Sequence, residues 1–500
     1  MQIKLYTFVF LLFSCLNNAF AQQPIPNNWC GYSGKSPWLE WYQQNRDQLA
    51  QERGNDTAWL YVPMTLHIVG TNTGSGYFKI EQALRNICEM NGQFEEARIR
   101  FYLRPDDPVR YHNNSGWFTH QYFPGGDEMI NENYLFDRLN AFVVADPSGA
   151  CGYSWQDVIV LSTGCSGTGN YVWAHEAGHH LSLPHTFSGW EGFSWDYSNP
   201  APDEVNGHPV EKLDGSNCLW AGDGFCDTPP DYLNYRWGCD TNQQSPTIQR
   251  DPDGEEFRSD GTLFMAYPSD ECASRFSTEQ IEAMRANLYT EHEVYIQQPP
   301  PFTEIDDSVV VELVSPIDSQ AVQYNNATLT WKPVPNATIY TVEVGLAPNL
   351  IPKFYSQTLY NTTSVTITGS IPNNRALKWR VRAYNEWDVC NPNGAVQTGT
   401  FTTTNLSSTN DLDRSIVAEL SPNPVIAGMP AYLTVTSDET MSATLNVTDA
   451  AGRLCHNESL RLGVGENRIE IPTGQLSAGI YILTLRNEKG SLMKRLAVTE

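Results

Sequence analysis

Four histidines and one glutamate lie within the eleven residues from His175 to His185. His175 and His179 are four residues apart, so on a helix, which advances about 100° per residue, they project from one face. A helix that continued beyond this point would carry His185 away from them. Pro184 disfavours such a continuation, and we therefore expect the chain to turn sharply near Ser182. The segment therefore predicts a helix that ends near Ser182, followed by a turn that brings His185 back towards His175 and His179.

This set of side chains suits a zinc ion. Neutral imidazoles are good Zn²⁺ ligands, and three protein ligands leave one tetrahedral position for water, whose pKa falls to about 7 on coordination. Glu176 follows the first histidine directly. Its carboxylate can take a proton from that water and pass it to a leaving amine. We predict that His175, His179 and His185 bind zinc and that Glu176 is the general base.

The same residues resemble the metzincin peptidases, and His-Glu-Ala-Gly-His followed by Leu-Pro-His-Thr-Phe is most similar to the pappalysin/cytophagalysin family. The resemblance covers about residues 58–292 and implies an α/β catalytic domain with the zinc ligands and base named above. Ser182 departs from it, because the family usually has glycine there. A serine at positive φ costs roughly 1 kcal/mol relative to glycine.

Leu263-Phe264-Met265-Ala266-Tyr267 resembles the Met-turn of the same group of enzymes. The resemblance implies that Met265 lies under the metal and that Tyr267 stands near it, where the phenol can donate to a developing oxyanion. A lone methionine is otherwise a common core residue. Asp270 and Glu271 follow in the part of metzincins that shapes the pocket after the scissile bond. An acidic wall there favours substrates with Lys or Arg at that position.

Four cysteines follow the histidine motif: those at positions 218, 226 and 239 precede Met265, and the one at position 272 lies just after it. They contain no Cys-x-x-Cys pair, and an exported chain meets an oxidising environment, so we expect disulfides rather than a second zinc site. The resemblance implies that Cys218 pairs with Cys239 and that Cys226 pairs with Cys272.

The segment around Cys226-Asp227-Thr228-Pro229 resembles a loop of the same family. Oxygen ligands from Asp223, Asp227 and Thr228 suit the hard cation Ca²⁺. Acidic residues of a solvated loop explain the pattern equally well, so calcium binding is one of two interpretations.

The N-terminus has the parts of a secretory signal peptide: Lys4, an apolar run from Leu5 to Leu16, and small residues at Ala19 and Ala21. No later segment is apolar for long enough to predict a transmembrane helix. The polar segment that follows is expected to be a pro-segment. It contains Cys30, whose thiolate can occupy the open position of a zinc ion, as in several metzincins. A disulfide with another cysteine is the alternative.

Two further domains are expected after the catalytic domain. Alternating apolar residues around Trp331 and Tyr340 resemble a fibronectin type III domain. The last part resembles the C-terminal sorting domain of the type IX secretion system, with Pro-Asn-Pro at 422–424, Gly-Ile-Tyr at 479–481 and a basic end; one more adhesive sandwich is the alternative. The predicted fold is multidomain: an α/β metzincin-like catalytic domain followed by two small all-β sandwiches. The predicted boundaries are 1–21 for the signal peptide, 22–55 for the pro-segment, 56–296 for the catalytic domain, 297–308 for a linker, 309–404 for the first sandwich, 405–415 for a second linker and 416–500 for the sorting domain.

The net charge of −26 speaks against nucleic acid as a partner, because phosphate backbones attract basic surfaces. We expect a secreted or surface-attached zinc endopeptidase, made as a latent zymogen, that cleaves proteins or peptides and is exported by the type IX machinery. Two other classes remain open. One is a surface-binding protein whose peptidase domain is inactive, and the other is a zinc amidase that acts on cell-wall peptides.

Overall fold

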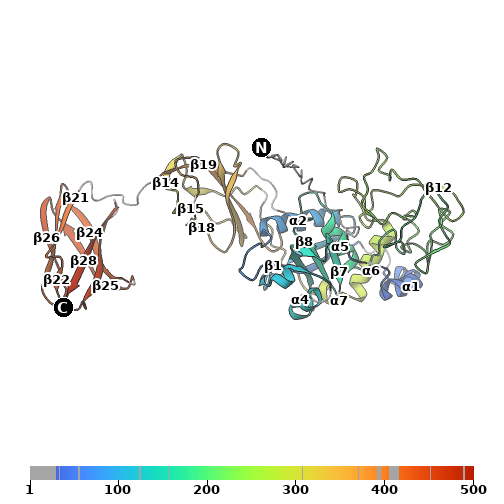
Figure 1. Cartoon of the computed structure of the whole chain (residues 1–500), viewed down its shortest axis with the longest axis horizontal. Helices are drawn as coiled ribbons and strands as arrows, with labels where there is room; N and C mark the ends of the chain where they lie inside the picture. Colours follow the sequence, from blue (N-terminus) through green and yellow to red (C-terminus); the bar gives the residue numbers. More distant parts are fainter. Residues whose placement is uncertain are drawn as a thin grey trace, which may run out of the picture.

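The structure is a computed structural model of the chain, and Figure 1 shows its main bodies in chain order. It describes residues 30–32, 34–53, 57–122, 125–155, 157–306, 308–369, 371–390, 396–404, 416–450, 452–487 and 490–499. The predicted signal peptide lies outside these residues. No helix among them combines the length and the apolar character needed to cross a bilayer.

A six-stranded sheet forms the centre of the first body. Its strands are β1 (Leu60–Gly70), β2 (Ile99–Leu103), β3 (Val109–Asn113), β5 (Leu139–Val144), β7 (Gly152–Trp155) and β8 (Val158–Ser162). The order is β2-β1-β5-β8-β7, and β3 continues beside the later half of β1. All pairs are parallel except β7 with β8, so β7 is an antiparallel edge strand. The apolar runs predict such strands, because central strands of parallel sheets are buried on both faces.

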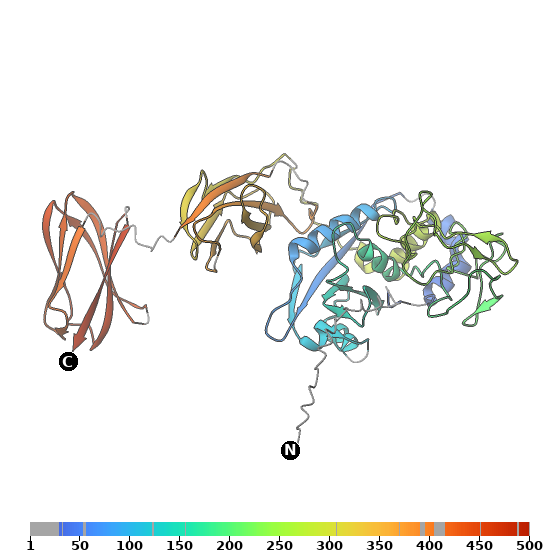
Figure 2. The same cartoon turned by 45° about the horizontal axis from the view of Figure 1, so that its top comes forward.

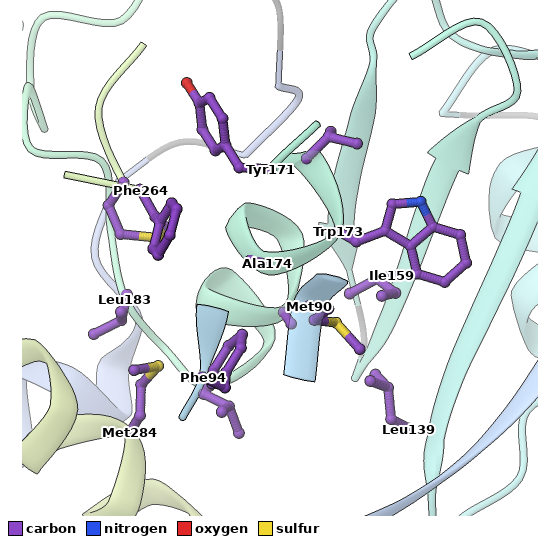
Figure 3. Packing of buried hydrophobic residues seen from close by; sticks show 14 of the residues in the cluster. Met90, Phe94, Leu139, Ile159, Tyr171, Trp173, Ala174, Leu183, Phe264 and Met284 are labelled. Carbon is purple, nitrogen blue, oxygen red and sulfur yellow. The ribbon is translucent and has the colours of Figure 1, made fainter. Parts of the chain in front are cut away.

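Helices pack against this sheet and beside it. They are α1 (Pro37–Arg53), α2 (Ile80–Gln93), α3 (Ser115–Phe118), α4 (Gly126–Asn133), α5 (Val172–His180), α6 (Thr278–Thr290) and α7 (Glu293–Ile296). Ser277 begins α6 with a capping box that includes Gln280. Every residue of α5 is buried. Figure 3 shows the apolar side chains of other segments that pack around α5: Met90, Phe94, Leu139, Ile159, Leu183, Phe264 and Met284.

Between α5 and α6 the chain has little regular structure. It contains the short ribbons β9 (Glu204–Val205) with β10 (His208–Pro209) and β11 (Gln249–Arg250) with β12 (Glu256–Phe257). In the first body, β4 (Thr119–His120) pairs with β6 (Asp146–Pro147).

Two disulfides hold this irregular region, and both differ from the predicted pairs. Cys218 is bonded to Cys226, and Cys239 is bonded to Cys272. Backbone hydrogen bonds explain the second bond, because the amide of Trp237 donates to Tyr267 and the amide of Ser269 donates to Trp237. These contacts place Cys239 beside Cys272, so the pairing taken from the family resemblance is wrong.

The second body has two sheets around one apolar core. One sheet contains β13 (Leu313–Ser315), β15 (Ala327–Trp331) and β18 (Ser364–Ile367). The other contains β14 (Gln320–Gln323), β20 (Thr398–Thr404), β19 (Ala376–Tyr384), β16 (Ile339–Leu346) and β17 (Lys353–Tyr360). An all-β unit at this place agrees with the sequence; its fibronectin type III character remains a prediction.

This second body is joined to the first more closely than the predicted linker suggests. Cys88 on α2 forms a disulfide with Cys390. The guanidinium of Arg100 lies over the ring of Trp387, 4.0 Å from its centroid. Arg382 lies 3.7 Å from the carboxylate of Glu81. A covalent bond, a cation–π contact and an ion pair therefore connect the two bodies.

The last body repeats the arrangement of a three-stranded and a five-stranded sheet around one core. The first sheet contains β21 (Ile416–Ser421), β23 (Ala431–Ser437) and β26 (Gly465–Ile471). The second contains β22 (Val425–Ile426), β28 (Gly490–Thr499), β27 (Gly479–Asn487), β24 (Met441–Asp449) and β25 (Leu454–Leu462). Figure 2 shows the long paired strands of this body.

The disulfide between the first two bodies gives a stability prediction. Replacing Cys88 and Cys390 together by serine removes a bond that closes a separation of 302 residues. We expect a loss of about 2–4 kcal/mol in the free energy of unfolding, because the unfolded chain regains freedom. Calorimetry of the double variant against Cys455→Ser, which removes a free cysteine, measures the effect. Equal unfolding temperatures for both variants would show that the bond contributes nothing.

Candidate active site

The three predicted zinc ligands meet at one point. The Nε2 atom of His179 lies 3.0 Å from that of His175 and 3.2 Å from that of His185. His175 and His179 come from α5, and His185 returns from the segment beyond its end. All three are buried. The structure thus brings together the ligands that the spacing predicts.

Each of these rings uses its other nitrogen for an outer contact. The Nδ1 atoms face the carbonyl of Phe264 at 2.7 Å, the carbonyl of Leu183 at 2.7 Å and the carboxylate of Glu191 at 3.2 Å. A neutral ring that donates from Nδ1 has only a lone pair at Nε2. Three such lone pairs that face one another repel unless a cation lies between them. The donor set therefore fits zinc, whose imidazole ligands commonly make such outer hydrogen bonds.

The turn after α5 sets the position of His185. Ser182 has φ +70°. Its amide donates to the carbonyl of His179, and the amide of Leu183 donates to that of Gly178. This is a Schellman motif with serine at the position that usually holds glycine. The Oγ atom of Ser182 accepts a hydrogen bond of 3.1 Å from the side chain of Asn287 on α6, which offsets part of the backbone strain.

Glu176 is fully buried beside the three rings. Burial raises its pKa to about 8, and the hydrogen bond from Cys30 opposes this shift. A dication bound to the neighbouring histidines favours the carboxylate form instead. The Oε1 atom has no hydrogen-bond partner among the described residues, so it is free to accept a proton.

Met265 lies directly under α5. A Cβ atom at Gly178 would meet the sulfur of Met265 at 2.6 Å, so a larger residue there would displace this side chain. The amide of Thr186 also donates to the carbonyl of Met265, at 3.2 Å. Met265 therefore supports both the helix and the segment that carries His185.

Tyr267 stands at the edge of the histidine cluster. Its hydroxyl lies 3.2 Å from Nε2 of His185 and receives a hydrogen bond of 3.1 Å from the amide of Cys30. It also donates to the Cys30 carbonyl, at 3.3 Å. Burial raises the pKa of this phenol far above its ordinary value, so the hydroxyl keeps its proton.

Cys30 occupies the open side of the cluster. Its sulfur, which forms no disulfide, groups with the ligand nitrogens of the three histidines, all within 4.8 Å of one another. The thiol donates to Glu176 at 3.5 Å. Cys30 also forms a bridge with Gly152 on the edge strand β7, and the amide of Gly31 donates to the Gly152 carbonyl at 3.0 Å. The disulfide alternative for Cys30 is therefore contradicted.

Other parts of the predicted pro-segment hold Cys30 in place. The ring of Tyr32 stacks on that of His179, with 4.1 Å between centroids. On α1, Trp38 donates to Thr290 of α6 at 2.8 Å, and Gln43 donates to the carbonyl of Gly224 at 3.1 Å. The sequence reasoning overlooked Tyr32 and Glu191. Tyr32 could have been predicted only from its position two residues after Cys30, and no sequence pattern marks Glu191.

Asp270 and Glu271 do not form a common acidic wall. Asp270 pairs with Arg236 at 3.1 Å and accepts a hydrogen bond from Asn170 at 3.3 Å. Arg236 also donates to the hydroxyl of Tyr171, which precedes α5. The charge of Asp270 is thus compensated, whereas Glu271 is exposed. A preference for basic substrate residues stays a prediction that now depends on Glu271.

The predicted calcium residues use their oxygens for hydrogen bonds. Thr228 donates to the buried carboxylate of Asp223 at 2.9 Å, and Asp223 also accepts from the amide of Phe225. Asp227 instead accepts from the amide of Glu279 at the start of α6. Among the described residues, no cluster of metal-binding side chains includes these acids. Calcium binding at this loop has no support from the geometry.

Comparison with known proteins identifies the C-terminal body of the chain. Residues 420–499 match the family described as the secretion system C-terminal sorting domain. The last body is a sorting domain. The protein is therefore exported by type IX secretion to the cell surface or the medium, as its sequence predicts.

The other comparisons are weaker. The solved structures similar to this chain include a mutant of promirolysin from Tannerella forsythia, with a TM-score of 0.36 and 17% identity over 53% of this chain and 95% of that one. Another is the FN1–FN3 segment of chicken CNTN1, with a TM-score of 0.20 and 10% identity over 39% of this chain and 68% of that one. The search among curated proteins found no match. Likenesses of this size carry no argument, so the proposed chemistry rests on the site itself.

The turn at Ser182 gives a prediction. Ser182→Ala removes the acceptor for Asn287 but keeps the strained backbone, so we expect a loss of about 1 kcal/mol in the free energy of unfolding. Ser182→Gly loses the same hydrogen bond but relieves the positive φ, so it should remain close to the wild type. Denaturant titrations of both variants, with the exposed Ser274→Ala as control, measure the difference. Equal losses in the two variants would refute this account of the turn.

Proposed function

We propose that the chain is a zinc-dependent endopeptidase of the metzincin type, kept latent by its pro-segment. The observation that carries the proposal is the convergence of three Nε2 atoms beside the buried carboxylate of Glu176. His175, His179 and His185 would hold the zinc, which when bound would supply the Lewis acidity that makes water more acidic and polarises a peptide carbonyl.

The residues around the histidines have distinct roles in this proposal. Glu176 accepts the proton of the attacking water and delivers it to the leaving amine. Tyr267 keeps its proton and donates a hydrogen bond to the oxyanion that develops on the carbonyl. The edge strand β7 offers backbone groups at Gly152, which a peptide substrate can pair with as an added strand.

The pro-segment opposes all three roles at once. The sulfur of Cys30 lies beside the three ligand nitrogens, where it can act as the fourth zinc ligand, and 3.5 Å from the carboxylate of Glu176. The backbone amide of Cys30 donates to the hydroxyl of Tyr267, and its backbone forms a bridge with Gly152 on the edge strand β7. Removal of this segment therefore has to precede substrate binding. Thiolate is a strong zinc ligand, which supports Cys30 as the group that maintains latency.

The peptidase activity is tested with Glu176→Gln. We expect casein digestion by the processed protein to fall by about 10²–10⁴-fold, because a general acid–base group contributes on this order. A chelator should abolish wild-type activity, and added zinc should restore it. Glu95→Gln removes an exposed carboxylate and should leave the rate unchanged.

Two results would contradict the proposed activity. If Glu176→Gln digests casein as fast as the wild type, Glu176 is not the base. If the zinc-loaded, processed wild type cleaves no protein substrate, a surface-binding protein becomes the better interpretation.

Latency is tested with Cys30→Ala. We expect the unprocessed chain to show activity on the order of tenfold or more above the unprocessed wild type, because a tenfold change needs only about 1.4 kcal/mol and a metal–sulfur bond is lost. Hydrolysis of a fluorogenic peptide before any cleavage of the chain measures this. Cys455→Ser, which removes the other free cysteine, is the matched control. Unchanged latency in Cys30→Ala would refute the role of Cys30.

A further inference from the structure

A second group of potential metal ligands lies beside α5. His180 follows His179, but its direction on the helix differs by about 100°, so its ring belongs to a different cluster. This cluster consists of His180, His292 and Asp157, whose ligand atoms all lie within 4.8 Å of one another. The peptidase mechanism proposed above uses none of the three.

The ring of His180 is buried, with 5% of the residue exposed. Neither of its nitrogens has a hydrogen-bond partner among the described residues. Such an arrangement is costly, because a buried imidazole normally satisfies both its donor and its acceptor. Both nitrogens are therefore available to a further partner, and a metal ion can bind to one of them.

His292 provides the second ring. It is buried between α6 and α7 and stacks on His180, with 4.6 Å between centroids and 20° between planes. Near-parallel rings do not prevent shared coordination, since His175 and His185 of the candidate zinc site lie 5.3 Å apart at 27°. The ring of Tyr295 stacks on His292 at 4.8 Å and limits its movement.

Asp157 completes the group from the turn between β7 and β8. Its carboxylate lies 4.0 Å from Nε2 of His292. Unlike the two histidines, Asp157 is exposed, with 56% of its side chain accessible. The cluster thus opens to solvent on one side, so an ion can enter and a water molecule can complete its coordination.

We propose that His180, His292 and Asp157 bind a second transition-metal ion, with zinc as the principal candidate. Two imidazoles and one carboxylate are typical ligands of zinc and its neighbours, whereas Ca²⁺ and Mg²⁺ require mostly oxygen ligands. The ion joins the end of α5, the β7–β8 turn and the α6–α7 junction. It therefore fixes the helix that carries His179 to the edge strand at Gly152, and its role is structural.

The test uses the untagged, unprocessed chain equilibrated with micromolar zinc and then freed of loose metal by gel filtration. Elemental analysis should find two zinc ions per wild-type chain. The double variant His175→Gln/His179→Gln should keep one, and His292→Gln should also keep one. His208→Gln changes an exposed histidine outside both clusters and should keep two.

A second variant covers the case in which His292→Gln fails to fold. Asp157→Asn changes an exposed side chain, and we expect it to weaken binding of the second zinc at least tenfold in a chelator competition. Cobalt substituted into the His175→Gln/His179→Gln chain should give the visible absorption of a nitrogen- and oxygen-bound ion, which Asp157→Asn alters.

These outcomes separate the two metal sites. If folded His292→Gln retains as much zinc as the wild type, or if Asp157→Asn binds it equally well, the second site is refuted. If the His175→Gln/His179→Gln variant retains two zinc ions while His292→Gln retains one, the proposed catalytic site is refuted and the second site is supported.

Discussion

The geometry of the candidate active site depends on the abrupt end of α5. The helix presents His175 and His179 on one face, and the Schellman turn at Ser182 returns the chain so that His185 reaches the same point. The strain at Ser182 is sustained because the surrounding structure fixes the turn from two sides. Met265 fills the space under Gly178, and Asn287 binds the serine hydroxyl. A change in either support would move a ligand without touching it.

Burial makes this arrangement costly in free energy, but it also excludes water from the candidate site. Three neutral imidazoles and one carboxylate lie in an interior that excludes water, where each unpaired polar atom is costly. Outer hydrogen bonds fix each ring so that the remaining lone pairs converge. The segment around Cys30 adds groups that satisfy this site, because the Cys30 backbone amide donates to Tyr267 and its thiol donates to Glu176. The same contacts would thus serve both the proposed latency and the pre-organisation of the site.

The sequence predicts the local parts of the site better than the distant ones. The spacing of His175, His179 and His185 forces a helix followed by a turn, and hydrophobic periodicity indicates the helices and central strands around it. The partners Glu191 and Tyr32 depend on how distant loops fold back, and no local pattern encodes that. The predicted disulfide pairing was wrong for the same reason, because the bond between Cys239 and Cys272 follows from backbone contacts near Tyr267.

The boundary between the first two bodies shows a related limit. A proline-rich stretch at 297–308 is typical of a linker, and it predicts a boundary between the first two bodies. The disulfide of Cys88 with Cys390 and the stacking of Arg100 on Trp387 join residues about three hundred positions apart. Since α2 also packs against α5 through the common core, these links connect the second body to the helix that carries the proposed zinc ligands. The candidate active site is therefore connected to a body outside the domain that carries its residues.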